Sequence, residues 1–309
     1  MKTLPYLLAL AALTAPPLAA QDDPAPTENS IVVTAQRSGA PMWTIDTPTG
    51  TIILVGEIRA IPETTPWQPD RLKDATAQAS RVILGARPKI SPGDVLRLIF
   101  SGSKFTKLPD KTEAPEYLTP QQWARLAALG EAHGEDYARQ SFLLTSFQML
   151  RKELRFNRDT ADEPADVVKK AADRADVPIT RAASLRGEDI IDNLADAPPA
   201  AHIPCLTAAM DAVESGPDVV EQRGADWRRY DIPAVMANPL EQALGQCWPW
   251  ADETLGTELR TIWVDNINAA QTQPGVTLAV VPLRVLAESD GVLDRLAAQG
   301  LDIAGPAWK

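Results

Sequence analysis

The sequence predicts an α/β protein whose central mixed, partly parallel sheet is built from both chain ends, with a large helical insert in the middle. Three observations lead to this fold class. A β-rich hairpin pattern begins at residue 42, and a helix pattern and a buried strand pattern follow it, which is a βαβ arrangement. A further strand pattern lies near the chain end, at 276–281. The segment between them, about 92–271, carries mostly helical periodicity.

The first elements follow from local signals. Two β-rich runs, 42–45 and 51–55, flank a turn with Pro and Gly and predict a hairpin. The loop 56–62 leaves the second strand. Apolar residues at helical spacing predict a helix over 68–80, and the short apolar run 81–84 predicts a buried strand. Because a helix separates the two strands, we expect them to run parallel.

Helical periodicity continues through the middle of the chain. Pro120 follows the capping residue Thr119, and together they predict the start of a helix that ends near His133. The other predicted helices are 92–100, 135–156, 164–175, 190–194, 205–213, 219–229, 239–246, 253–271 and 291–299, and the other predicted strands are 177–180, 276–281 and 301–303.

Composition excludes several kinds of site. The chain has 309 residues with a formal net charge of −11, 2 His and 2 Cys. Two histidines exclude a His₃ metal site, and two cysteines exclude a Cys₄ zinc site or an iron–sulfur cluster. The acidic balance argues against a nucleic-acid partner, because no basic surface excess is available, although a local basic pocket stays open. No Gly-rich phosphate loop is present.

The first residues predict export. Residues 1–20 combine the positive Lys2 with a short apolar core over 7–13 and end at Ala20, which is typical of a secretory signal peptide. A membrane anchor is the alternative, but the apolar run is too short to span a bilayer. We therefore expect no membrane span after signal removal. The polar, Pro-bearing residues 21–40 predict a disordered lead.

Export makes the two cysteines informative. Cys205 and Cys247 would lie in an oxidising compartment, where a pair tends to form a disulfide, and the alternative is two separate buried thiols. A bridge closing a loop of roughly 40 residues contributes ~3–4 kcal/mol in the chain-entropy estimate.

Four tryptophans are interpreted as core packing near this bridge, with an aromatic ligand groove as the alternative: Trp227, Trp248, Trp250 and Trp263.

Several segments together carry a family resemblance. The run MWTI at 42–45 precedes IILVGEIRAIP at 52–62, and LAVVPLRVLAESDGVL at 278–293 precedes a helix–Gly–strand pattern at 296–303. These runs, with Glu258, Arg260 and Trp263 on one helix, resemble the TraB/GumN family, bacterial relatives of the Tiki metalloproteases. The resemblance covers about 41–305. It implies one domain over 41–305, and with the export signal it implies a periplasmic or secreted location in a bacterium.

The family resemblance also shows what this chain lacks. The resemblance implies a metal site that is built from two motif histidines and a Glu. After Gly56, this chain has Arg59 at the first histidine position, Gly85 at the Glu position, and Arg284 or Val285 at the second histidine position. Guanidinium has no lone pair to donate, and glycine has no side chain. We therefore expect a pseudoenzyme without a cofactor, in which Mn, Co or Zn would require a rearranged site.

The arginines at and near these positions suggest a second role. Guanidinium groups that share a cleft bind carboxylate or phosphate in a bidentate manner. The candidates for binding an anionic ligand are Arg59, Arg87, Arg260 and Arg284. The alternative is internal neutralisation, in which Glu57 pairs with Arg59, and Glu288 pairs with Arg284.

Two other function classes stay open. An active hydrolase or peptidase could use a rearranged site around His133, which lies in the acidic run EAHGED, although such a run is more typical of a solvated helix end. An interaction module is the other class. Residues 31–37 resemble the start of the plug region of bacterial TonB-dependent receptors and could add a strand to an envelope partner, or form an edge strand of the domain itself.

Overall fold

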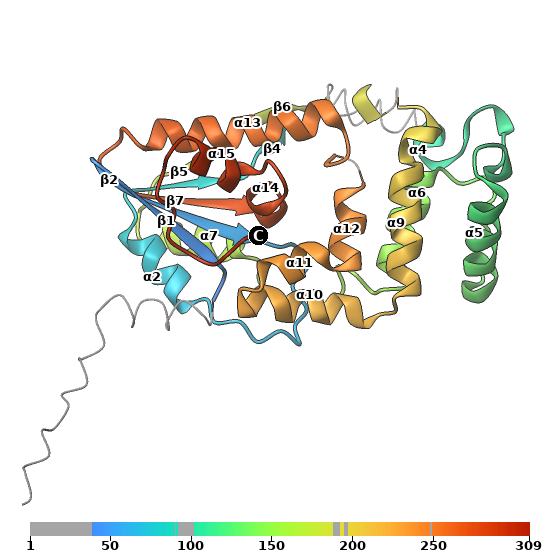
Figure 1. Cartoon of the computed structure of the whole chain (residues 1–309), viewed down its shortest axis with the longest axis horizontal. Helices are drawn as coiled ribbons and strands as arrows, with labels where there is room; N and C mark the ends of the chain where they lie inside the picture. Colours follow the sequence, from blue (N-terminus) through green and yellow to red (C-terminus); the bar gives the residue numbers. More distant parts are fainter. Residues whose placement is uncertain (1–38, 90, 92–101, 188–191, 195–196, 248) are drawn as a thin grey trace, which may run out of the picture. The chain divides into compact units, whose positions relative to one another are not determined.

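The structure is a computed structural model (Figure 1). It describes residues 39–89, 91, 102–187, 192–194, 197–247 and 249–309. Several predictions lie outside these residues, namely the signal peptide 1–20, nearly all of the lead 21–40 with its segment 31–37, the helix 92–100, the first two residues of the helix 190–194, and Trp248.

A five-stranded sheet forms the centre of the fold, in the order β1-β2-β7-β3-β5. β1 and β2 form an antiparallel hairpin, and the other neighbours are parallel. The strands are β1 (Met42–Thr47), β2 (Gly50–Glu57), β3 (Arg81–Leu84), β5 (Ile179–Arg181) and β7 (Gly275–Pro282). The prediction of a mixed, partly parallel sheet built from both chain ends is confirmed. β7 separates β2 from β3, so the two strands of the expected βαβ unit are not neighbours.

The pairing of β2 with β7 joins the two ends of the chain. The register runs from Gly50 opposite Gly275 to Glu57 opposite Pro282, so both strands end at the same edge of the sheet. A Cβ at Gly50 would lie 2.0 Å from the Gly275 carbonyl oxygen, so glycine permits this close approach. Both strands are almost fully apolar at their centres, as expected for parallel strands covered on two faces.

Helices cover the sheet. In the view of Figure 1, α13 lies above the strands and α2 below them. α2 packs against α7, and α13 packs against α15. The helices near the sheet are α2 (Asp70–Gln78), α7 (Pro164–Arg174), α13 (Glu253–Ala270), α14 (Leu283–Ala287) and α15 (Val292–Ala298). Trp227 and Trp263 are buried in the core around this sheet, which confirms their interpretation as packing residues.

The middle of the chain is mostly helical, as predicted, and has two apolar clusters of its own. Its elements are β4 (Arg87–Lys89), α4 (Gly102–Thr106), η1 (Pro109–Lys111), η2 (Ala114–Glu116), α5 (Pro120–His133), α6 (Phe142–Lys152), β6 (Ser184–Arg186), η3 (Pro199–His202), α9 (Ile203–Glu214), α10 (Asp218–Arg229), α11 (Ile232–Ala237) and α12 (Pro239–Gly245). Cys205 and Cys247 form a disulfide, so the predicted pairing is confirmed. No helix of the described part of the chain is long and apolar enough to cross a membrane.

Two local predictions need correction, and some short elements were not predicted. The helix expected over 135–156 begins only at Phe142, because Gly134 ends α5 in the left-handed region (φ 71°) and the Ser141 hydroxyl caps α6 by accepting a hydrogen bond from the Leu144 N–H. Residues 301–303 form no strand, and the described residues nearby contribute a bridge between Thr44 and Ala304. The parallel pair β4–β6 and the short helices α11 and α14 were not predicted.

Candidate functional site

The carboxyl ends of β2 and β7 bring together the two segments that carry the family motifs, 52–62 and 278–293. We call this edge of the sheet the motif edge, and the loop after β2 the motif loop. Gly56, near the end of β2, packs so closely that a Cβ would lie 2.8 Å from Leu283 and 2.9 Å from Trp43. The Gly56 carbonyl oxygen accepts a hydrogen bond of 2.9 Å from the Trp227 indole N–H of α10. Three segments therefore meet at this edge of the sheet: the loop after β2, the start of α14 and the end of α10.

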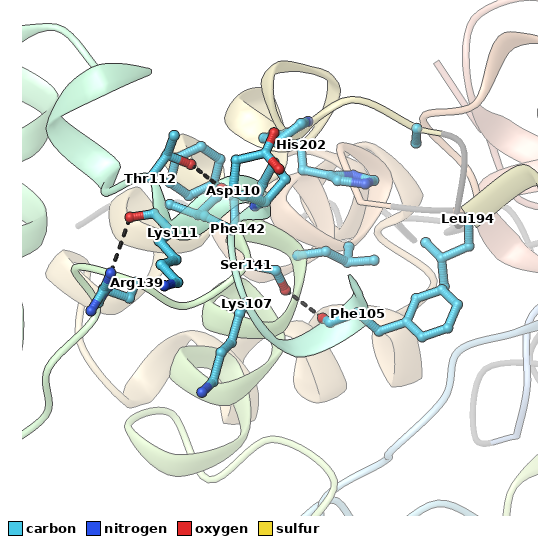
Figure 2. Close-up of a pocket in the computed structure, with 15 residues that line it drawn as sticks. Phe105, Lys107, Asp110, Lys111, Thr112, Arg139, Ser141, Phe142, Leu194 and His202 are labelled. Atoms are coloured by element: carbon cyan, nitrogen blue, oxygen red, sulfur yellow. Dashed lines mark hydrogen bonds between the residues drawn. The ribbon is translucent and has the colours of Figure 1, made fainter. Parts of the chain in front are cut away.

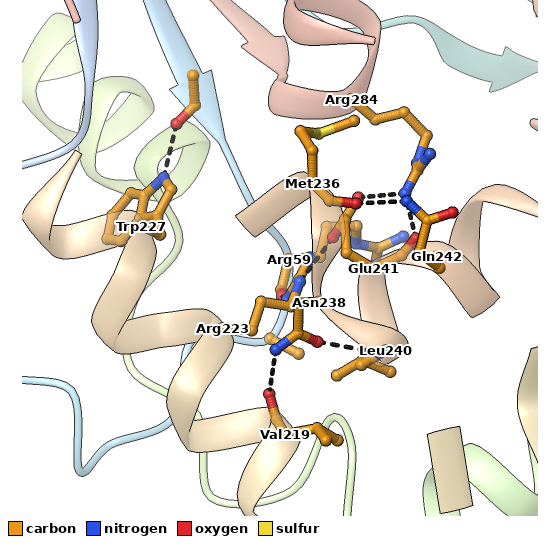
Figure 3. A network of polar contacts seen from close by, with 12 residues as sticks. Arg59, Val219, Arg223, Trp227, Met236, Asn238, Leu240, Glu241, Gln242 and Arg284 are labelled. Atoms are coloured by element: carbon orange, nitrogen blue, oxygen red, sulfur yellow. Dashed lines mark hydrogen bonds and ion pairs between the residues drawn. The ribbon is translucent and has the colours of Figure 1, made fainter. Parts of the chain in front are cut away.

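A buried ion-pair network lies beside this edge (Figure 3). Glu241 of α12 accepts from two arginines: Arg223 Nε lies 2.6 Å from Oε2, and Arg284 Nη2 lies 3.0 Å from Oε1. The side chains of Arg223, Glu241 and Arg284 are 4%, 6% and 12% exposed. Arg284 Nη2 also donates to the Glu241 carbonyl oxygen. Both carboxylate oxygens are thus occupied by guanidinium groups.

The network also holds the loop that follows β2. Arg223 Nη1 donates a hydrogen bond of 3.0 Å to the Arg59 carbonyl oxygen. The carboxylate of Glu241 therefore connects three helices, α10, α12 and α14, with the loop after β2. Gly245 makes room for this arrangement, because a Cβ there would lie 2.2 Å from Arg284 Nη1.

The electrostatics favour the ionised carboxylate. Burial opposes the charge of Glu241, but the nearby charges of Arg223 and Arg284 and their hydrogen bonds outweigh it, so the pKa of Glu241 lies below its ordinary value. Arg284 Nε is buried and has no hydrogen-bond partner among the described residues. Two cations share one buried anion, which makes Glu241 the residue on which the network depends.

The other predicted site residues lie in different surroundings. The Arg59 side chain is 82% exposed, with its Nε 4.0 Å from Glu163 Oε2. Arg260 Nη1 lies 2.7 Å from Glu288 Oε1. Gly85 follows β3, and a Cβ there would meet nothing within 4 Å. Arg87 belongs to β4, in the separate two-stranded sheet.

The structure distinguishes the two residues, Arg284 and Val285, that align with the second histidine position. Val285 is buried in the core around the sheet, whereas the side chain of Arg284 reaches the Glu241 network. Arg284 is therefore the one of the two that presents a polar group near the motif edge.

The neutralisation alternative named two ion pairs, Glu57 with Arg59 and Glu288 with Arg284, and neither is found among the described residues. Glu57 Oε1 accepts a hydrogen bond of 2.9 Å from the Ala165 N–H at the start of α7, and it does not pair with Arg59. Glu288 pairs with Arg260 and leaves Arg284 to Glu241. Internal neutralisation does occur for Arg260 and Arg284, but through Glu288, which follows α14, and Glu241 of α12.

Glu57 has an unusual environment of its own. Burial raises its pKa to about 7, and the Ala165 N–H and the charge of Arg59 oppose this shift, while the charge of Glu163 adds to it. Glu163, in turn, accepts a hydrogen bond of 2.9 Å from the Ala60 N–H. Two carboxyl groups therefore connect the loop after β2 with the amino end of α7.

The motif positions do not fit a metal ion. Arg59, Gly85 and Arg284 offer no electron pair, and the oxygens of Glu241 are already bound by guanidinium groups. Among the described residues, no group of three or more His, Cys, Asp or Glu side chains is placed to hold a cation. His133 lies elsewhere, with its Nδ1 2.5 Å from Glu153 Oε2.

Sequence reasoning missed Arg223 and Glu241. Both lie in the helical middle, where they match no motif. One signal was present, since Arg223 lies four residues from both Val219 and Trp227 and so shares their buried helix face. A charged residue on an apolar helix face requires a buried partner.

The fold defines a class of α/β protein in which strands from the two chain ends, β2 and β7, pair in parallel. The segments that follow these two strands both lie against the helical middle of the chain. The sequence profile of the TraB/PrgY/gumN family matches residues 41–304, so the chain belongs to this family. Neither the search of curated proteins nor that of solved structures gave a match.

Proposed function

We propose that this protein is an exported, non-hydrolytic member of the TraB/PrgY/gumN family, that is, a pseudoenzyme. One observation carries the proposal. At the edge where the two motif loops meet, Arg223 and Arg284 bind both carboxylate oxygens of Glu241. These three charged side chains are thus engaged with each other and support the fold.

The chemical argument concerns electron-pair donors. A metal-dependent hydrolase needs ligands that hold the cation and leave an open position for water. The Arg59 and Arg284 side chains are permanent cations that repel a metal ion. Releasing Glu241 as a ligand would leave two guanidinium groups without their counter-charge, at 4% and 12% exposure.

Metal analysis with a peptidase assay tests this proposal. The purified full-length protein is incubated with Mn²⁺, Co²⁺ or Zn²⁺, desalted and measured by elemental mass spectrometry, and it is then assayed on a peptide library beside an EDTA-treated sample. We expect far less than one metal ion per chain and equal, background cleavage in both samples. A stoichiometric metal with EDTA-sensitive turnover would overturn the proposal.

Export is the second part of the proposal. Its support is the pattern of residues 1–20 and the Cys205–Cys247 disulfide, because disulfides persist mainly in oxidising compartments. Cell fractionation and terminal sequencing of the native protein test it. We expect a periplasmic or secreted chain that begins near Gln21. A cytosolic chain that keeps its first twenty residues would contradict export.

Binding of an anionic ligand at this edge is a second candidate function, favoured by the exposure of Arg59. Its side chain is 82% exposed and its Nε lies 4.0 Å from Glu163, so the guanidinium is available to an external anion. Arg260 and Arg284 are already paired with Glu288 and Glu241, so this proposal does not include them. A screen of carboxylate and phosphate compounds with wild-type and Arg59→Ala protein tests the idea, which fails if every hit binds both proteins equally.

A further inference from the structure

A pocket far from the motif edge in sequence combines an apolar wall with cationic side chains. It encloses about 900 Å³, a size typical of small-molecule sites. α4 and η1 form one part of it, and the start of α6 and the residues before α9 form the rest. The apolar part of its lining consists mainly of Phe105, Leu108, Phe142, Leu143 and Leu194.

Charge is distributed unevenly around this pocket. Among the described residues, Lys107, Lys111 and Arg139 line it together with one carboxylate, that of Asp110. In the view of Figure 2, the charged ends of the three cations lie on one side, and Phe105 lies on the other. The chain as a whole has a net charge of −11, whereas the charge around this pocket is positive, so the pocket attracts anions.

The cations of the pocket are available to a ligand. Neither Lys107 nor Lys111 forms an ion pair or a side-chain hydrogen bond with any residue that the structure describes. Arg139 keeps a long contact of 3.7 Å to Glu113. His202, in the wall, also lacks a hydrogen-bond partner within the described ranges, and burial lowers its pKa, which favours the neutral imidazole at pH 7.

The pocket is held in shape before any ligand binds. The Ser141 hydroxyl donates 2.6 Å to the Phe105 carbonyl oxygen, and Arg139 Nη2 donates 3.0 Å to the Lys111 carbonyl oxygen. Asp110 and Lys111 both have positive φ angles, 52° and 61°, which is an uncommon, strained backbone for residues with side chains. This turn directs the chain of η1 along the pocket.

We propose that this pocket binds a single-chain amphiphile with an anionic head group, such as a fatty carboxylate. The head would lie against Lys107, Lys111 and Arg139, and the chain would lie along Phe105, Leu143 and Leu194. A carboxylate or phosphate head forms charge-assisted hydrogen bonds with these cations, and the apolar wall removes the chain from water. The proposal is independent of the pseudoenzyme proposal, because it uses none of the motif residues.

Calorimetry with matched ligands tests the proposal on the full-length protein, below the micellar concentration of dodecanoate and the solubility limit of dodecanol. Dodecanoate carries head and chain, dodecanol carries the chain alone, and acetate and inorganic phosphate carry the charge alone. We expect one dodecanoate per chain, bound at least tenfold more tightly than the other three, and weakened by added NaCl. Equal affinity for dodecanol and dodecanoate would overturn the anionic head. Tighter binding of phosphate would show a free anion site and would also overturn the proposal.

Matched variants identify the site. Lys107→Ala/Lys111→Ala should weaken dodecanoate binding at least tenfold and leave the weak dodecanol binding unchanged. The control Arg151→Ala/Lys169→Ala removes two exposed cations outside the pocket and should change neither. Leu143→Gln should weaken both ligands. If the control and the pocket variant behave alike, the effect is one of net charge and the site assignment is wrong.

A competition experiment separates the lipid-like ligand from an acidic peptide. An octapeptide of Asp and Glu should not displace dodecanoate, because it has no apolar chain to occupy the wall. Displacement at concentrations similar to those of dodecanoate would show that the pocket is a peptide site and would refute the proposal.

Discussion

Replacing Glu241 by Gln tests the buried network most directly. The substitution keeps the size and shape of the side chain and removes the one negative charge between Arg223 and Arg284. Both guanidinium groups stay buried, at 4% and 12% exposure, and Arg284 already has an unpaired Nε. The variant therefore places two uncompensated cations in the protein interior.

The expected loss of stability follows from this geometry. Removing one partner of a buried ion pair costs about 3–5 kcal/mol, because the remaining charge stays desolvated. For a chain of this size the melting temperature then falls by roughly 10 °C. Urea unfolding, followed by the fluorescence of the buried tryptophans, measures the free energy. Trp227 is a suitable reporter because its indole N–H is bound to Gly56 at the same edge.

Two control variants separate charge from packing. Glu258→Gln removes an exposed carboxylate from α13 and should change the free energy of unfolding by less than about 0.5 kcal/mol. The triple variant Arg223→Met/Glu241→Met/Arg284→Met removes all three charges and should recover most of the stability, since apolar replacement of a buried triad is about neutral or stabilising. A loss below about 1 kcal/mol in Glu241→Gln would refute the reasoning.

The remaining predictions concern three other features. The pKa of Glu57 is raised to about 7 by burial, so the folded state binds its proton more tightly than the unfolded state, and stability should fall by up to ~3 kcal/mol as the pH rises through the interval from 4.5 to about 7. Glu57→Gln should remove this slope in urea titrations at pH 5 and pH 8, and an unchanged slope would contradict the assignment. Reducing the Cys205–Cys247 disulfide should lower the free energy of unfolding by up to about 4 kcal/mol, and Cys205→Ala/Cys247→Ala should make thermal melting insensitive to dithiothreitol. Gly245→Ala should displace the Arg284 guanidinium, because its Cβ would lie 2.2 Å from Nη1, and should cost about 1–3 kcal/mol. That explanation fails if Gly245→Ala is as destabilising in an Arg284→Met background.

Local signals were sufficient for much of the fold. The Pro/Gly turn predicted the hairpin, Thr119 and Pro120 predicted the start of α5, and export chemistry predicted the disulfide. The prediction failed between Gly134 and Ser141, where apolar spacing continued through residues that are not helical. There a left-handed glycine and a serine cap, which act through single backbone positions, outweigh the periodicity.

Residue chemistry alone determined that the motif positions offer no metal ligands, because arginine has no lone pair and glycine has no side chain. Only the tertiary structure decided which acid neutralises which arginine. Glu57 lies near Arg59 in the sequence, yet it is bound at the amino end of α7, and Arg284 pairs with Glu241, 43 positions away. Burial makes an unpaired charge costly, so the partner is the group that packing brings within reach, and neighbours in sequence have no advantage.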